Sequence, residues 1–293
     1  MRGSSLLPRG PALLPGRILG IDAGGSGTRV VVVENGTVTP QPDELPINVL
    51  LTEGFAGRLL QIIKAADVTA AGVGLAGLRQ EAQAAELTAT LTRQAGRPVH
   101  VTGDADTAQA GAFLGGPGVV VIAGTGSMAF GRDGERHVRA GGHGFLLGDE
   151  GSAYWIGRAA AQAALAWQDR MGGSELIHRR VLEVTGTGLD DLVSDVCSHP
   201  AERSRLTALA PVLTALAGED PEAERITRQA AEHLAALAGS VRDRLGPLPV
   251  AGAGRVFGAS LIWDRFTELT GAIRPLAPAS VGAALLAARH AAA

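Results

Sequence analysis

Residues 17–38 read RILGIDAGGSGTRVVVVENGTV, and this stretch decides the fold. Two apolar runs flank a glycine-rich turn, and the tripeptide ENG after the second run is typical of a tight hairpin turn. The glycines therefore join two antiparallel strands. In a dinucleotide-binding site or a P-loop the glycines open a helix instead, so the stretch differs from both kinds of site.

The same pattern returns at residues 118–142, which read GVVVIAGTGSMAFGRDGERHVRAGG. A buried strand again meets a turn, here Gly-Thr-Gly-Ser, a second strand follows, and RDGE predicts another hairpin. Each copy is followed by helices and further strands. An internal repeat of this kind favours an α/β protein with two similar domains that face each other across a cleft.

The remaining elements are predicted from hydrophobic periodicity and turn residues. Asp220 and Pro221 suit the N-cap and first position of one helix. Helices are expected at 54–66, 81–94, 107–114, 152–170, 174–185, 202–217, 221–245 and 278–292, and further strands at 68–77, 98–104 and within 248–257. The domain boundaries that follow are a loose arm at 1–16, an N-terminal domain at 17–115 with a closing helix at 278–293, and a C-terminal domain at 116–277.

Composition excludes several classes of function. The 293 residues carry 26 basic and 29 acidic side chains without a basic block, which argues against a nucleic-acid or anionic-membrane partner. No apolar run is long enough to span a membrane, and a homodimer stays open. Cys197 is the single cysteine, which excludes an intrachain disulfide and a thiolate cage for zinc, and a cytoplasmic protein is therefore expected. Lys64 is the single lysine, in a helix-like segment without a P-loop signature.

Three glycine-rich turns, at 24–28, 124–127 and 252–254, each follow a buried strand. Glycine lets backbone N–H groups converge on an anion, so turns opposed across a cleft could hold the phosphates of a nucleotide. Asp22 precedes the first turn and could reach Mg²⁺ through water, or simply form the turn. Asp104 lies at a strand-to-helix junction, where a helix N-cap is the alternative role. Asp106 competes with it for either role.

These motifs carry a resemblance to a known family. GIDAGGSGT at 20–28, GDA at 103–105, AGTGS at 123–127, GGHGFLLGDEGSAYWIG at 141–157 and AGAGRVF at 251–257 resemble, in order and spacing, the N-acetylglucosamine kinase branch of the BadF/BadG/BcrA/BcrD ATPase family. That family belongs to the actin/hexokinase/Hsp70 superfamily. The resemblance covers nearly everything from residue 17 onward. It implies two ribonuclease-H-like (actin-like ATPase) domains, with ATP, Mg²⁺ and a sugar in the cleft between them.

The resemblance also implies roles for individual residues. Asp104 resembles the catalytic base that takes the proton of the sugar hydroxyl, and Asp22 resembles the carboxylate near the metal. The positions that match the nucleotide-binding residues are Gly25, Ser26, Thr28, Thr125, Gly126, Ser127, Gly252 and Gly254. The positions that match the sugar-binding residues are Asn48, Gly142, His143, Gly144 and Asp149.

Two adjacent acids, Asp149 and Glu150, lie between glycines just before the helix expected at 152–170. By resemblance, Asp149 accepts hydrogen bonds from sugar hydroxyls, and the glycines let backbone and ligand approach closely. Glu150 either contacts the sugar or favours the positive N-terminus of the helix, with Ser152 as the cap.

The implied reaction is transfer of the ATP γ-phosphoryl group to the 6-hydroxyl of N-acetylglucosamine or glucosamine. The human-type enzymes of this branch carry a tryptophan where this chain has His143, which leaves the preference for the acetyl group open. Three other functions compete. Dehydratase-activating ATPases of the family share a [4Fe–4S] cluster between subunits and need two cysteines per chain, but this chain has one. A nucleotide-dependent sugar-sensing regulator would carry a DNA-binding module, for which residues 1–16 are too short. ROK-type sugar kinases carry a cysteine-rich zinc motif that the sequence lacks.

Overall fold

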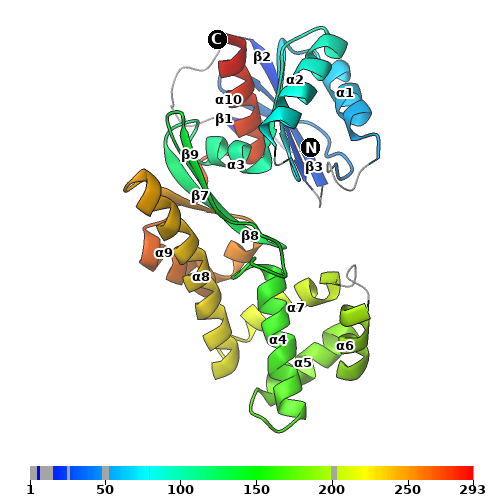
Figure 1. Ribbon diagram of the computed structural model, residues 1–293, viewed down its shortest axis with the longest axis vertical. Helices are drawn as coiled ribbons and strands as arrows, with labels where there is room; N and C mark the ends of the chain where they lie inside the picture. Colours follow the sequence, from blue (N-terminus) through cyan, green and yellow to red (C-terminus); the bar gives the residue numbers. More distant parts are fainter. Residues whose placement is uncertain are drawn as a thin grey trace. The chain divides into compact units, whose positions relative to one another are not determined.

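The computed structural model describes residues 5–6, 16–24, 27–47, 53–78, 80–198 and 203–292, and has the α/β fold that the sequence predicts (Figure 1). The chain divides into two compact units. One consists of Met1–Gly118 together with Arg274–Ala293, and the other of Val119–Ile273. Each unit contains one β-sheet with helices packed against it.

The first unit is built on a six-stranded sheet with the order β1-β4-β3-β2-β5-β6. As predicted, β2 (Arg17–Gly24) and β3 (Gly27–Glu34) pair antiparallel, and β3 continues into β4 (Thr37–Pro40). The connecting residues Asn35 and Gly36 both have positive φ, at 45° and 82°, as a tight hairpin turn requires. β5 (Ala70–Leu75) and β6 (Val99–Gly103) extend the sheet in parallel with β2.

Within the segment expected to be a loose arm, the short strand β1 (Ser5–Leu6) pairs antiparallel with β4. Ser5 lies opposite Val38, and Leu6 opposite Thr37. β4 would otherwise leave its outer backbone groups without a strand partner, and a short added strand satisfies some of them.

Both faces of this sheet are buried, because successive side chains of β2 point in opposite directions. Leu19 and Ile21 pack in the core shared with α1 (Phe55–Ala65) and α2 (Glu81–Ala95), whereas Ile18 packs with α10 (Ala279–Ala292). The helix α10 lies directly on the backbone of the sheet. A Cβ built on Gly20 or Gly72 would lie 1.9 Å from the carbonyl oxygen of a residue of α10.

The helix α3 (Asp104–Ala112) begins directly after β6, three residues earlier than the sequence prediction of 107–114. Its N-cap is Gly103, in an extended conformation, and two acidic residues occupy the first turn, where the helix dipole favours negative charge. Asp104 is therefore the first residue of the helix. It does not have the N-cap role that was its structural alternative.

The second unit repeats the strand arrangement of the first, as the sequence predicts. Its sheet has the order β10-β7-β8-β9, with β7 (Gly118–Ala123), β8 (Ser127–Asp133) and β9 (Arg136–Gly141). β8 and β9 pair antiparallel, and β10 (Val250–Ala253) pairs parallel with β7. The glycine-rich turn at 124–126 connects β7 to β8, in the place that the first turn occupies between β2 and β3.

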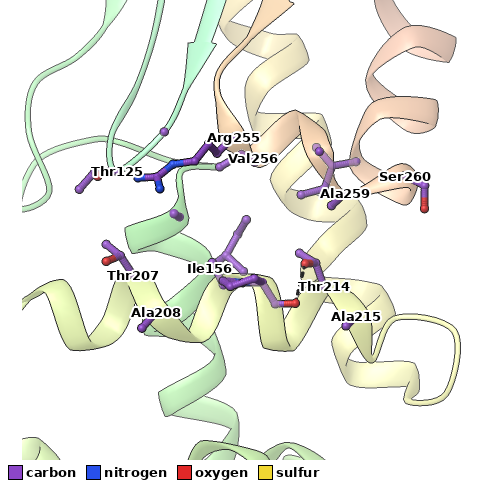
Figure 2. Close-up of a pocket in the computed structure, with 16 residues that line it drawn as sticks. Thr125, Ile156, Thr207, Ala208, Thr214, Ala215, Arg255, Val256, Ala259 and Ser260 are labelled. Carbon is purple, nitrogen blue, oxygen red and sulfur yellow. Dashed lines mark hydrogen bonds between the residues drawn. The ribbon is translucent and has the colours of Figure 1, made fainter. Parts of the chain in front are cut away.

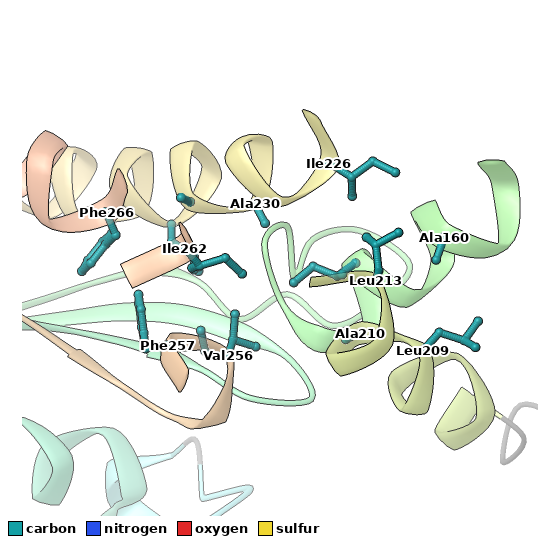
Figure 3. Close-up of a cluster of buried hydrophobic side chains, with 14 of the residues drawn as sticks. Ala160, Leu209, Ala210, Leu213, Ile226, Ala230, Val256, Phe257, Ile262 and Phe266 are labelled. Atoms are coloured by element: carbon teal, nitrogen blue, oxygen red, sulfur yellow. The ribbon is translucent and has the colours of Figure 1, made fainter. Parts of the chain in front are cut away.

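Helices make up most of the second unit. α4 (Ala153–Gln168), α5 (Glu175–Thr185), α7 (Arg203–Ala215) and α8 (Pro221–Leu245) confirm predicted helices, and Asp220 caps α8 by accepting hydrogen bonds from the amides of Glu222 and Ala223. α6 (Leu189–Ser198), α9 (Ser260–Thr270) and the short 3-10 helix η2 (Arg255–Gly258) were not predicted. Side chains of α4, α7, α8, η2 and α9 form one apolar core (Figure 3). Among the described helices, none has the length and apolar character needed to cross a bilayer.

Candidate functional site

Two carboxylates lie at the same edge of the sheet in the first unit. In the strand register Asp22 pairs with Gly74, and Gly74 pairs with Thr102, so Asp104 follows only two residues beyond the level of Asp22. The two acids interact electrostatically. Burial raises the pKa of Asp22 to about 6, with the negative charge of Asp104 contributing to the rise and Arg29 opposing it.

The donor set at this edge suits a hard cation. Among the residues that the structure describes, no three His, Cys, Asp or Glu side chains gather into a metal-binding cluster. Mg²⁺ does not require one, because one or two carboxylates suffice when phosphate and water oxygens complete its shell. Asp22 therefore fits the expected position beside a magnesium ion, with its raised pKa marking a desolvated carboxylate that a cation would ionise.

Thr28 ends the first glycine-rich turn, whose Gly25 and Ser26 lie outside the described residues, as does Asn48. Thr28 is fully buried, its amide donates to the carbonyl of Glu44 at 3.1 Å, and its hydroxyl donates to the carbonyl of Leu45 at 2.9 Å. This geometry speaks against the expected phosphate contact of Thr28. The hydroxyl instead anchors the chain segment that leads toward Asn48.

Ser127 connects the second glycine-rich turn to the loop at 142–152. Its amide donates to the Oδ1 atom of Asp149 at 3.3 Å, and its hydroxyl donates to the carbonyl of Glu150 at 2.7 Å. Its carbonyl accepts a hydrogen bond from the amide of Gly142 at 2.9 Å. The amide and the hydroxyl of the buried Ser127 therefore both donate within the protein, and Ser127 stabilises the turn. Thr125, which is exposed, and Gly126 remain as groups of this turn that a phosphate could reach.

Asp149 has the left-handed backbone conformation, with φ of 62°, which few residues other than glycine adopt. Its carboxylate fills the space beside Gly126, where an added Cβ would lie 2.7 Å from Oδ2. Burial raises the pKa of Asp149, the hydrogen bond from the Ser127 amide lowers it, and the charge of Glu150 raises it. The resemblance implies a sugar beside Asp149, and the structure adds a direct contact with the second turn.

The other residues expected near the sugar lie in the same loop. Gly142 and Gly144 both have positive φ, at 68° and 86°, and the exposed His143 lies between them. Arg139 holds this end of the loop by donating to the carbonyl of Gly142 at 2.8 Å. The loop therefore has a backbone that L-side chains would strain, which explains its glycines.

The loop ends at the N-terminus of α4. Ser152 caps this helix as predicted, because its hydroxyl accepts a hydrogen bond from the amide of Trp155 at 3.2 Å. The side chain of Glu150 is exposed, and the contact that ties this residue to the turn comes from its backbone carbonyl. The two adjacent acids thus differ: the carboxylate of Asp149 faces the turn, whereas that of Glu150 faces solvent.

The third turn has a packing role in addition to any role in binding. Gly254 has φ of 106°, and a Cβ there would lie 2.2 Å from the carbonyl oxygen of Ala123 at the end of β7. A Cβ on Gly252 would lie 3.0 Å from the ring of Trp263. Both glycines let the turn pack closely, and the residues that follow them, from Arg255 to Ile262, contribute one wall of a cavity.

A cavity of about 680 Å³ lies wholly within the second unit (Figure 2). It is lined by the second turn, the start of α4, one face of α7, η2 and the start of α9; the lining residues are Gly124, Thr125, Ala153, Ile156, Thr207, Ala208, Ala210, Pro211, Thr214, Ala215, Arg255, Val256, Gly258, Ala259, Ser260 and Ile262. Of the expected nucleotide-binding residues, only Thr125 is among them. No sequence motif predicts the α7 wall, because its residues are small and carry no charge. Arg255 does have a sequence signal, since it is a charged residue directly after a glycine-rich turn.

Comparisons with known proteins show the family and the fold of the chain. The model of the BadF/BadG/BcrA/BcrD ATPase family matches residues 19–287. The N-acetylmuramic acid/N-acetylglucosamine kinase of Clostridium acetobutylicum is 29% identical, over 74% of this chain and 76% of that protein. The solved structure of a candidate N-acetylglucosamine kinase from Chromobacterium violaceum is 27% identical, with a TM-score of 0.72 over 94% of this chain and 99% of its own. A ROK family glucokinase from Streptomyces griseus, 17% identical, shares the fold with a TM-score of 0.58 over 94% of this chain and 99% of that chain.

Proposed function

The chain belongs to the BadF/BadG/BcrA/BcrD ATPase family, and from this membership we propose that it is an ATP-dependent sugar kinase that phosphorylates the 6-hydroxyl of N-acetylglucosamine or glucosamine. The observation that carries the proposal is the pair of acids, Asp22 and Asp104, at one edge of the first sheet. A base for the sugar hydroxyl and a carboxylate for a magnesium ion are the two acidic groups that such a reaction needs.

Asp104 is the proposed base. The sugar oxygen attacks the γ-phosphorus, the bond between that phosphorus and its bridging oxygen breaks, and ADP leaves. The carboxylate of Asp104 takes the proton of the attacking hydroxyl, which leaves the phosphorylated sugar and a protonated Asp104. General-base catalysis of this kind contributes about 10²–10⁴-fold to a rate.

Asp22 is the proposed carboxylate beside Mg²⁺. The ion, when bound, would offset the negative charge of the phosphates. Its positive charge would also favour the ionised form of Asp22, whose pKa is raised to about 6 without it. The two carboxylates repel each other when both are ionised, so a cation beside Asp22 would also relieve that repulsion.

On the nucleotide side, the cavity in the second unit is proposed to hold the adenosine, with Thr125 and Gly126 next to the phosphates. Its wall is apolar over Ile156, Val256 and Ile262, as the faces of a purine require. The sugar is proposed to contact Asn48, Gly142, His143, Gly144 and Asp149.

The choice of an amino sugar rests on the relatives. The kinase of Clostridium acetobutylicum is named for N-acetylmuramic acid and N-acetylglucosamine. By resemblance, a tryptophan is expected at the position of the exposed His143, where its flat apolar ring would lie near the sugar. Glucosamine, which lacks the acetyl group of N-acetylglucosamine, is therefore the matched test substrate.

The decisive experiment incubates the protein with ATP, Mg²⁺ and a panel of sugars, and measures both ADP and the phosphorylated sugar by mass spectrometry. We expect one amino sugar to give equal amounts of both products. Asp104→Asn should lower kcat by about 10²–10⁴-fold and leave nucleotide binding unchanged. Asp106→Asn, two residues further along α3, is the matched control. ADP release without any phosphorylated sugar would overturn the kinase proposal in favour of an ATPase or a regulator.

A further inference from the structure

The cavity of the second unit contains one charged lining residue, Arg255, and no acidic one among the described residues. The other polar groups on its wall are hydroxyls. Those of Thr207 and Thr214 donate to backbone carbonyls of their own helix, Ser204 at 2.7 Å and Pro211 at 3.2 Å. A cavity with one positive charge and no carboxylate is suited to an anionic ligand with an apolar part.

The side chain of Arg255 makes no polar contact with the rest of the described chain. Within the part of the chain that the structure describes, its guanidinium has no hydrogen bond and no ion pair. Two other arginines of the unit are engaged: Arg139 donates to the carbonyl of Gly142, and Arg242 donates to the carbonyls of Leu248 and Thr270. The single lysine of the chain, Lys64, lies in α1 of the other unit. Neutralisation of an anion in this cavity therefore falls to Arg255.

The backbone fixes where Arg255 starts. Gly254 packs against the end of β7, where an added Cβ would lie 2.2 Å from the carbonyl oxygen of Ala123. Ala123 is followed by Gly124 and Thr125, which line the cavity. Figure 2 shows the side chain of Arg255 extending from η2 toward Thr125, across the upper rim of the cavity. The guanidinium thus lies on the side of the second glycine-rich turn, away from α7.

We infer that Arg255 is a nucleotide-binding residue that contacts a phosphate group of the ligand held against the second turn. This inference rests on the proposed function. The planar guanidinium matches two phosphate oxygens at once, which gives stronger binding than a single neutral hydrogen bond. The alternative is that the guanidinium stacks on the base. Ile156 and Ile262 are better placed to contact the base, because they give the cavity its apolar surface.

The test measures the dissociation constants of adenosine, ADP and ATP by titration calorimetry for the wild-type protein, Arg255→Ala and Arg255→Lys. We expect Arg255→Ala to weaken ADP and ATP at least about tenfold and adenosine less than about twofold. Arg255→Lys should recover part of the loss. Raising NaCl from about 0.05 to 0.5 M should weaken ADP more in the wild type than in Arg255→Ala, because the lost contact is ionic.

The matched control is Arg158→Ala, which removes the same charge from an exposed position of α4 that does not line the cavity. It should leave all three constants unchanged. Equal loss of adenosine and ADP in Arg255→Ala, or no loss of either, would overturn the phosphate contact while the kinase proposal stands. A wild-type protein that binds no nucleotide would instead overturn the proposed function, and this inference with it.

Discussion

The Asp149 carboxylate accepts a hydrogen bond from the backbone amide of Ser127 at 3.3 Å, which joins the proposed sugar loop to the second glycine-rich turn. The contact depends on Gly126, because a Cβ on that residue would lie 2.7 Å from the Oδ2 atom of Asp149. Asp149 therefore has one role toward the turn and a second, proposed role toward the sugar. A change in this one side chain should affect both ligands.

We predict that Asp149→Ala raises KM for the sugar and KM for ATP together. A sugar hydroxyl without its charged acceptor costs about 1.5–3 kcal/mol, or roughly 10- to 100-fold, and the released turn weakens ATP as well. Steady-state kinetics with each substrate varied in turn give both constants. The control is Glu150→Ala, whose exposed side chain should matter for neither. A rise confined to the sugar constant would show that the contact with Ser127 has no part in nucleotide binding.

A double-mutant cycle tests the same contact without relying on activity. Gly126→Ala should destabilise the wild-type protein, because the new methyl group meets the Asp149 carboxylate. In the Asp149→Ala background that clash is absent, so the same change should cost less. The loss of unfolding free energy caused by Gly126→Ala should be larger in the wild type than in the Asp149→Ala background, by about 0.5–3 kcal/mol, as expected for residues in contact. Additive costs would contradict the close approach of these two residues.

The second prediction concerns the contact between α10 and the first sheet. Gly72→Ala should lower the free energy of unfolding by more than about 2 kcal/mol, because its Cβ would lie 1.9 Å from the carbonyl oxygen of Ala283 and neither backbone can move alone. Gly57→Ala in α1 is the matched control. Its Cβ would meet nothing within 4 Å, so it should stabilise the helix by about 0.5–1 kcal/mol. Urea denaturation gives the free energy of unfolding of both variants. Equal changes from the wild-type value would contradict the close packing of α10 on the sheet.

Periodicity made much of this fold predictable. The two strand–turn–strand repeats and the long helix α8 have strong patterns and clear turn or cap residues, and the structure confirms each close to its predicted bounds. The start of α3 was missed because Asp106 suits an N-cap, which would start the helix at residue 107, although acids in a first helical turn are favourable. α9 was missed because the glycine turn before it is the stronger local pattern. Its apolar residues Ile262 and Phe266 have helical spacing.

The site was less predictable, since a sequence shows which donors exist but not where they point. Ser127 and Thr28 were expected among the nucleotide-binding residues, yet both hydroxyls donate to backbone carbonyls of their own unit. Such internal bonds depend on contacts with residues 17 to 23 positions away, which no local pattern reveals. The α7 wall of the cavity escaped prediction for the same reason.

The third prediction concerns Thr28, whose hydroxyl donates to the carbonyl of Leu45 in the segment that precedes Asn48. Thr28→Val keeps the shape and removes the donor, so it should cost about 0.5–1.5 kcal/mol in stability. If the hydroxyl only anchors this segment, KM for the sugar should rise while KM for ATP stays constant. Thr28→Ser, which keeps the hydroxyl, should restore the sugar constant. A rise in the ATP constant alone would instead support the phosphate contact that the resemblance implied.

The fourth prediction follows from Asp22, whose pKa is raised from 3.8 to about 6, mainly by burial. Because the folded state binds this proton more tightly than the unfolded state, the stability that this group contributes is greatest below about pH 4 and is lost as the pH rises through 6. Above pH 6 the ionised Asp22 costs up to about 3 kcal/mol, at roughly 1.36 kcal/mol for each pKa unit. Asp22→Asn resembles the protonated acid, so it should raise the free energy of unfolding at about pH 7.5 and leave it nearly unchanged at about pH 4.

Asp264→Asn, at an exposed position of α9, is the control for the substitution itself and should change the free energy of unfolding at about pH 7.5 much less than Asp22→Asn does. Adding Mg²⁺ and ADP should narrow the gap between Asp22→Asn and the wild type at the higher pH, since a bound cation stabilises the ionised acid of the wild type alone. Urea denaturation at both pH values, with and without these ligands, gives the free energies. An Asp22→Asn protein that is less stable than the wild type at the higher pH would contradict the proposal that Asp22 is a desolvated carboxylate that a bound cation stabilises.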